Sequence, residues 1–111
     1  MENESVVANL EPDFKALAQL ESRGVIVTAG GSGVDFISRC FFPAFGIDED
    51  PVTGSAHTTL VPFWSKKLEK TVMTARQISQ RGGFLKCHLL GKRTAISGQA
   101  VTYLEGVIVI R

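Results

Sequence analysis

The chain has 111 residues, of which 44% are hydrophobic and 21% charged, and its 12 basic and 11 acidic side chains leave a formal net charge of +1. These values are typical of one soluble globular domain that is large enough for a real core. The near-neutral charge excludes the basic footprint of nucleic-acid binding, and no apolar run is long enough to span a bilayer. Residues 1–5 lack the basic region of a signal peptide, so we expect a cytoplasmic location.

The first residues predict little regular structure before one surface helix. Residues 6–10 form a short apolar segment, which we expect to be a strand or the remnant of one. Residues 12–21 carry apolar side chains largely on one helical face, with Pro12 suited to the first helical position. Gly24 follows its end.

A hairpin is predicted next. Residues 24–29 are rich in β-branched side chains, and residues 34–42 alternate as a strand does. The glycine-rich residues 30–33 between them lack the lysine of a phosphate-binding loop, so we interpret them as the hairpin connection.

An acidic loop is expected over residues 43–50. It ends with Asp48, Glu49 and Asp50, whose spacing does not match a calcium-binding loop. We expect Asp48 and Glu49 to be solvated, whereas Asp50 stands beside Pro51 and the start of the next helix.

The central helix is predicted over residues 55–68. Its apolar side chains cover more than one stripe, which indicates that the helix is largely enclosed. Pro62 inside it should mark a kink or break.

Everything after this helix reads as strand. The predicted strands are residues 72–79, 84–90, 93–97 and 100–110, joined by short glycine-containing turns. Consecutive short strands imply a mostly antiparallel sheet. With one long helix to bury, we predict an α+β fold in which a curved, mostly antiparallel sheet or barrel wraps around that helix.

The start of the central helix is the candidate site. Pro51 fixes its own backbone, Gly54 lets a ligand approach closely, and Thr53 or Ser55 can cap the helix. Free N–H groups in the first helical turn would form an anion site with Asp50 beside them. From these residues alone, a plain capped helix after an acidic loop is the favoured interpretation, because Thr-Gly-Ser turns are common.

A family resemblance favours the functional interpretation. Residues 49–57 (EDPVTGSAH), preceded by residues 35–39 and 42–47, closely resemble the phenazine-biosynthesis PhzF-like family, which has a diaminopimelate-epimerase-like fold. Further matches lie at residues 76–77, 81–83, 97–101 and 104–106. The likeness runs from about Pro12 to the C-terminus. Members of that family have two similar lobes with the active site between them, so this chain resembles the C-terminal lobe alone, as a single domain over residues 1–111.

The resemblance implies a cofactor-independent isomerase that moves a proton on a small, carboxylate-bearing, amino-acid-like substrate. Asp50 and Ser55 match the positions that contact the reactive side of the substrate. The substrate-binding positions that the resemblance implies are Thr53, Gly54, Ser55, Ala56 and His57. The main acid/base glutamate of the family lies in a Gly-Asn-Pro turn of the first lobe, which this sequence lacks, so we read Asp50 as an orienting or proton-relay group.

Two functions follow as alternatives. In the first, the chain supplies half of an isomerase site, is inactive alone, and works with a separate first-lobe chain or in a homo-oligomer. In the second, it is a non-catalytic binding or protein-interaction module that uses the carboxylate site or the apolar face that a first lobe would cover.

The remaining reactive side chains suggest no further chemistry. Two histidines and two cysteines without paired short spacing are weak evidence for a metal, so no metal or cofactor is predicted. Strand alternation makes Cys40 and Cys87 packing residues rather than catalytic thiols. His57 could act as a base only with a substrate proton in reach, and a polar residue on an accessible helix end is the alternative.

Overall fold

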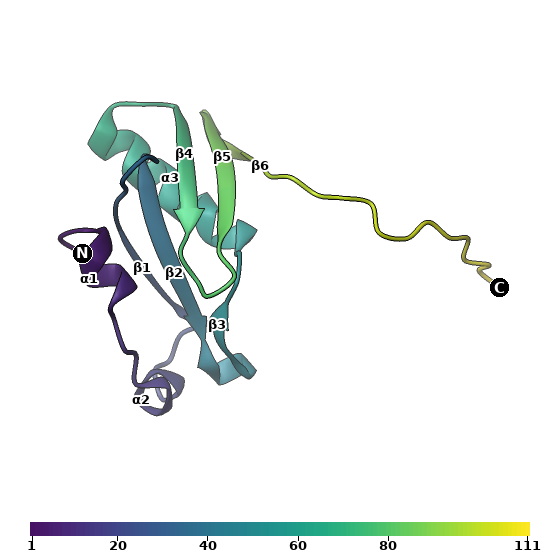
Figure 1. Cartoon of the computed structure of the whole chain (residues 1–111), viewed down its shortest axis with the longest axis horizontal. Helices are drawn as coiled ribbons and strands as arrows, with labels where there is room; N and C mark the ends of the chain where they lie inside the picture. Colours follow the sequence, from purple (N-terminus) through teal and green to yellow (C-terminus); the bar gives the residue numbers. More distant parts are fainter.

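The computed structural model describes residues 1–111 and has one six-stranded sheet with a long helix across one face (Figure 1). The helices are α1 (Glu4–Ala8), α2 (Phe14–Ala18), the 3₁₀ helix η1 (Pro43–Phe45) and α3 (Gly54–Leu68). The strands are β1 (Val25–Gly30), β2 (Phe36–Phe42), β3 (Ile47–Asp50), β4 (Val72–Gln77), β5 (Gly83–Leu90) and β6 (Arg93–Ser97). The predicted α+β class is confirmed.

The sheet runs in the order β1-β2-β4-β5-β6, with β3 also paired to β2. Only β2 and β4 are parallel, and every other pair is antiparallel. Strand β4 pairs with the first half of β2 at Phe36–Ser38, whereas β3 pairs with its second half at Cys40 and Phe42. The last residues of β3 and β4 therefore meet beside the middle of β2.

The main core lies between α3 and the sheet. The buried positions of α3 form one stripe, which consists of Ala56, His57, Leu60, Val61, Trp64 and Ser65. The Trp64 ring stacks on Phe36, with 5.7 Å between ring centroids, and its Nε1–H donates to Thr28 Oγ1 at 2.9 Å. The indole thus buries its apolar surface and satisfies its one donor.

The expectation that α3 is largely enclosed is wrong for this chain. Phe63 is 53% exposed and Leu68 is 36% exposed, so the helix packs by one stripe and leaves its opposite side open. Pro62 lies within α3, which continues to Leu68, so the predicted break is absent. The helix continues through Pro62 because the packing of its buried stripe offsets the loss of the one backbone N–H donor that proline lacks.

The other face of the sheet is covered by α1, and here two expectations are wrong. Residues 6–10 are not a strand: Asn3 accepts a hydrogen bond from Val6 N at 3.0 Å and caps α1, which buries Val7 against Ala29 and Ile37. The predicted helix over residues 12–21 is only the five-residue α2. Asp13 caps it, so Pro12 lies before the helix rather than in its first position.

The acidic loop contains a strand that the sequence did not suggest. Residues Ile47–Asp50 pair with β2 as β3. Glu49 is not solvated, because its carboxylate forms an ion pair with Arg39 of β2 at 2.7 Å. Charged side chains are rare in strands, but a cross-strand pair of opposite charge offsets that disadvantage.

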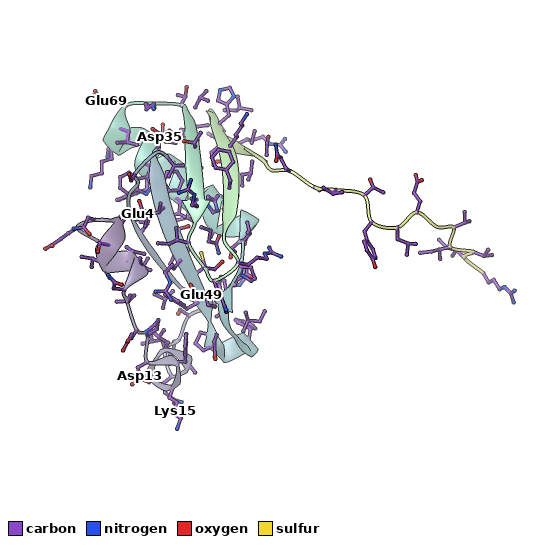
Figure 2. The ribbon with its side chains drawn as sticks, viewed as in Figure 1. Glu4, Asp13, Lys15, Asp35, Glu49 and Glu69 are labelled. Carbon is purple, nitrogen blue, oxygen red and sulfur yellow. The ribbon has the colours of Figure 1, made fainter.

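The predicted strand over residues 100–110 is absent. Residues 98–111 form no helix or strand, and Figure 1 shows them running away from the sheet as an extended tail. Side chains along this tail stand clear of the rest of the chain (Figure 2), with Tyr103 100% and Ile110 92% exposed. A strand needs hydrogen-bonding partners, and β6 pairs only with β5.

The longest helix, α3, has 15 residues. No helix of the chain combines the length and the apolar character needed to cross a membrane.

Candidate active site

The candidate site is the turn between β3 and α3, over residues 50–57. Its position follows from the sheet, because Asp50 ends β3 opposite Cys40 and Gln77 ends β4 opposite Ser38. Two strands that approach β2 from different directions thus stop within a few residues of each other. The start of α3 lies over this junction.

One buried side chain, Gln77, ties this turn together. Its Oε1 accepts from Thr53 N at 2.7 Å, and its Nε2 donates to Asp50 O at 2.9 Å and to Thr53 Oγ1 at 3.0 Å. Thr53 Oγ1 in turn donates to Asp50 Oδ2 in a short hydrogen bond. Ser79 Oγ adds a further contact at 2.8 Å to the carbonyl of Pro51. The path of the chain from Asp50 to Thr53 is therefore fixed at several points.

The N-terminus of α3 is left open by this arrangement. Thr53 is the N-cap residue, but its side chain makes no capping hydrogen bond to the helix. The first-turn N–H groups of Gly54, Ser55 and Ala56 have no intrahelical acceptor by the geometry of a helix end. No side chain accepts from them, so these donors are free in the way that the predicted anion site requires.

The predicted binding residues do not all present the same groups. Gly54 and Ser55 are exposed, and a Cβ added at Gly54 would meet nothing within 4 Å, so there is open space above this backbone. Thr53 is only 8% exposed and its N–H is held by Gln77, so it shapes the site rather than facing it. Ala56 contributes its backbone, since its side chain is buried.

His57 is fully buried, which differs from the accessible position considered above. Its Nδ1 lies 2.8 Å from Thr53 O, so Nδ1 carries the hydrogen and donates it. Burial lowers the pKa of His57 below its ordinary value of 6.5, and the bond to the Thr53 carbonyl opposes this shift. Nε2 is buried and has no partner. In this structure the imidazole is a neutral core group that does not reach a surface ligand.

Asp50 keeps one oxygen free. The hydrogen bond from Thr53 occupies Oδ2, whereas Oδ1 accepts no hydrogen bond within the chain. The Asp50 side chain is partly exposed. A carboxylate oriented through one oxygen can accept a proton or a hydrogen bond from a ligand through the other.

Two arginines lie in the surface hollows that touch this turn. Arg23 shares a hollow with Ser55 and Ala56, and Arg81 lines those that contain Pro51 and Val52. Gly83 packs closely against the Val52 side chain of this turn, and a Cβ at position 83 would come within 2.0 Å of it. Each of these hollows thus contains one arginine, and Glu49 shares the hollow around Pro51 with Arg81.

The cysteines lie beneath the site without reactive character. Burial raises the pKa of both Cys40 and Cys87 to about 11, and both are free thiols. The packing role predicted for them agrees with this environment. No group of three or more His, Cys, Asp or Glu side chains is placed to hold a metal ion.

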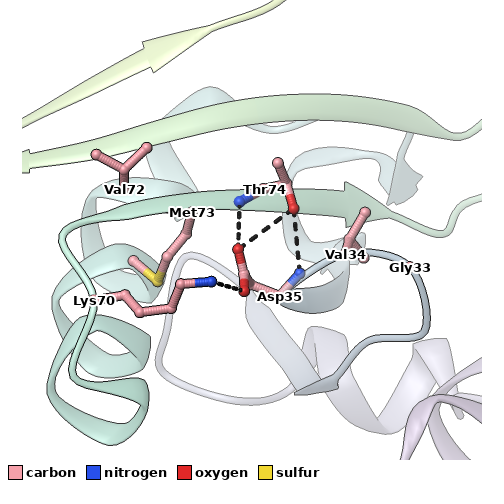
Figure 3. A pocket seen from close by; sticks show the side chains of 7 residues that line it. All are labelled: Gly33, Val34, Asp35, Lys70, Val72, Met73 and Thr74. Atoms are coloured by element: carbon pink, nitrogen blue, oxygen red, sulfur yellow. Dashed lines mark hydrogen bonds and ion pairs between the residues drawn. The ribbon is translucent and has the colours of Figure 1, made fainter.

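A separate hollow lies at the start of β2, around Asp35 (Figure 3). Asp35 pairs with Lys70 at 2.6 Å and accepts from Thr74 N at 2.8 Å, and the hydrogen bond from Lys70 is the main reason that its pKa is lowered. Both carboxylate oxygens are occupied. This cluster ties β2 to β4 and to the connection after α3, and the Asp35 carboxylate is fully used within the chain.

Comparisons with known proteins identify one family. The family model for phenazine biosynthesis-like proteins (PhzC-PhzF) matches residues 1–106. An uncharacterized isomerase of Pseudomonas aeruginosa is 55% identical over 108 residues, which cover 97% of this chain and 41% of that protein. The human phenazine biosynthesis-like domain-containing protein is 41% identical over 96% of this chain and 41% of its own length.

Solved structures are similar over the same extent. A PhzF-family protein from Enterococcus faecalis superposes with a TM-score of 0.86 at 52% identity, covering 88% of this chain and 38% of that one. A putative phenazine biosynthesis PhzC/PhzF protein from Clostridium difficile gives a TM-score of 0.87 at 46% identity, covering 99% and 43%. The chain thus spans about two fifths of the relatives it matches. It belongs to the phenazine biosynthesis-like PhzC-PhzF family.

Proposed function

We propose that this chain supplies the carboxylate-binding half of a cofactor-independent isomerase site, which moves a proton on a small amino-acid-like substrate. The observation that carries this proposal is the open start of α3, where the N–H groups of Gly54, Ser55 and Ala56 stand beside the free Oδ1 of Asp50. The name of the P. aeruginosa relative, an uncharacterized isomerase, supports the reaction class.

The chemistry divides between the two features of the site. The helix N-terminus holds the substrate carboxylate and stabilises negative charge that develops next to it during proton removal. Asp50 and the exposed hydroxyl of Ser55 orient the amino or hydroxyl group on the reactive side and relay its proton. The main base is the glutamate that the family resemblance places in a first lobe, so binding and proton transfer are separable in this chain.

The test uses 2-aminobenzoate as a probe, with neutral 2-aminobenzamide as the matched control. In an amide NMR titration, we expect the carboxylate to shift Gly54, Ser55 and Ala56 and the amide to leave them in place. With a cyclic amino acid in ²H₂O, we expect no deuterium incorporation at the carbon next to its carboxylate by this chain alone. Equal shifts with both compounds would overturn the carboxylate assignment.

A non-catalytic module is the second candidate, and the exposed apolar tail favours it. Val101, Tyr103, Leu104 and the aliphatic residues 107–110 are all at least 76% exposed, an apolar surface that another polypeptide would cover. Supplying the glutamate-bearing first lobe of a relative discriminates the two functions. Deuterium exchange at that carbon of the cyclic amino acid supports the isomerase, whereas tight association of the two lobes without exchange supports the module.

A further inference from the structure

We infer that Gln77 is a positioning residue. It keeps the N-terminus of α3 open to an anionic ligand, because its hydrogen bonds to the backbone and hydroxyl of Thr53 keep that hydroxyl off the helix end. The inference deepens the proposed function and rests on it for the identity of the ligand. It assigns a role to a side chain that lies on a different element and is itself fully buried.

The first step concerns the capacity of the Gln77 amide. Its carbonyl oxygen accepts from Thr53 N, and its amino group donates to both Asp50 O and Thr53 Oγ1. A rotation that exchanged Oε1 and Nε2 would bring two donors together at Thr53 N and two acceptors together at Asp50 O. The orientation is therefore determined by the network, and no amide hydrogen is left for another partner.

The second step concerns what Thr53 would otherwise do. A threonine at the N-cap normally turns its hydroxyl onto an N–H of the first helical turn. Here Oγ1 accepts from Gln77 and donates to Asp50, and these two partners hold it away from the first-turn N–H groups of α3, to which it makes no capping hydrogen bond. Without Gln77, the hydroxyl can rotate onto Ser55 N or Ala56 N and compete with a ligand carboxylate for the same donors.

The third step concerns the alternative, a merely structural role. A purely structural Gln77 would contribute to stability without affecting the helix end. The contacts argue otherwise, because all three partner atoms belong to Asp50 or Thr53, the residues that border the anion site. The register of the sheet supports this, since the parallel pairing with β2 brings the end of β4 to the end of β3.

The test compares Gln77→Met, which keeps the volume but removes all three contacts, with Met73→Ala as a control. Met73 is a buried residue on the same strand and face, and it does not touch the turn. The ligand-free readout is the Thr53 amide, which in wild type should be protected from hydrogen exchange while Gly54 and Ser55 exchange fast. We expect Gln77→Met to remove that protection and to weaken 2-aminobenzoate binding about tenfold, whereas Met73→Ala should change neither.

The outcomes separate this inference from the proposed function. An unprotected Thr53 amide in wild type overturns the inference without any variant, so the test survives if Gln77→Met does not fold. Unchanged 2-aminobenzoate affinity in a folded Gln77→Met protein also overturns it. A protected Thr53 amide together with no binding of 2-aminobenzoate by wild type would instead overturn the proposed ligand class and leave the hydrogen-bonding role of Gln77 in place.

Discussion

Substitution of Gly54 by valine separates ligand binding from stability at this site. The position lies at the first residue of α3, and a Cβ there meets nothing within 4 Å, so the new side chain enters open space without displacing protein atoms. The free energy of unfolding should change by less than about 1 kcal/mol, the range of helix propensities. The branched side chain fills the space that a carboxylate needs in order to reach the first-turn N–H groups.

The expected loss of binding follows from the hydrogen bonds removed. A hydrogen bond to a charged group contributes about 1.5–3 kcal/mol, so losing one weakens 2-aminobenzoate binding at least about tenfold. Affinity is measured by amide NMR titration and stability by urea denaturation. Gly30→Val is the matched control. Its new side chain also enters open space, and Gly30 pairs with Phe36 at the start of β2, away from Cys40 and the candidate site. Undiminished affinity in Gly54→Val would refute the assignment of the anion site.

Three further predictions concern the core around the site. Trp64→Ala should cost about 3–5 kcal/mol in urea denaturation, because it removes a 5% exposed indole stacked on Phe36, and a loss below about 1 kcal/mol would mean that Trp64 is not part of the core. Burial lowers the pKa of His57 below its ordinary value of 6.5, so the unfolded chain binds the proton more readily than the folded chain does. The free energy of unfolding should therefore fall as the pH drops below about 6.5. His57→Gln should lose that component of the pH dependence, and an identical profile would contradict it. Cys40 and Cys87, with pKa values of about 11, should react with iodoacetamide in the native state at least about a hundredfold more slowly than in urea, and comparable rates would disprove their burial.

Strands β1, β2, β4, β5 and β6 could be predicted because their signals are local. Alternating apolar side chains and short glycine turns mark the three hairpins, and the register that the structure shows follows from those turns. The helix α3 was equally clear, since it was predicted over residues 55–68 and is observed at Gly54–Leu68. These elements carry their own pattern and need no distant information.

The errors arose where a partner decides the conformation. Residues 100–110 have the composition of a strand, yet no neighbouring strand pairs with them. Strand β3 has the composition of a solvated loop, yet Arg39 pairs with Glu49 and stabilises it. Strand propensity mainly reports how a side chain fits a pleated, half-buried surface, so it fails when that surface is missing or unusual.

The candidate site was predictable only where its residues are neighbours in the sequence. The sequence around Gly54 indicated an anion site, and the structure adds that the Thr53 hydroxyl does not close it. Gln77 was missed as a site residue, although its place in the alternation with Met73 and Ala75 marks a polar side chain on a buried face. A buried amide needs partners, but only the pairing of β2 with β3 and β4 shows which ones.

The central claim is that the start of α3 binds a carboxylate, and the amide NMR titration of the whole chain with 2-aminobenzoate tests it most directly. We predict saturable shifts confined to Gly54, Ser55 and Ala56, with no such shifts from 2-aminobenzamide. A well-dispersed spectrum in which these three amides do not move, or move equally with the neutral compound, would contradict the claim.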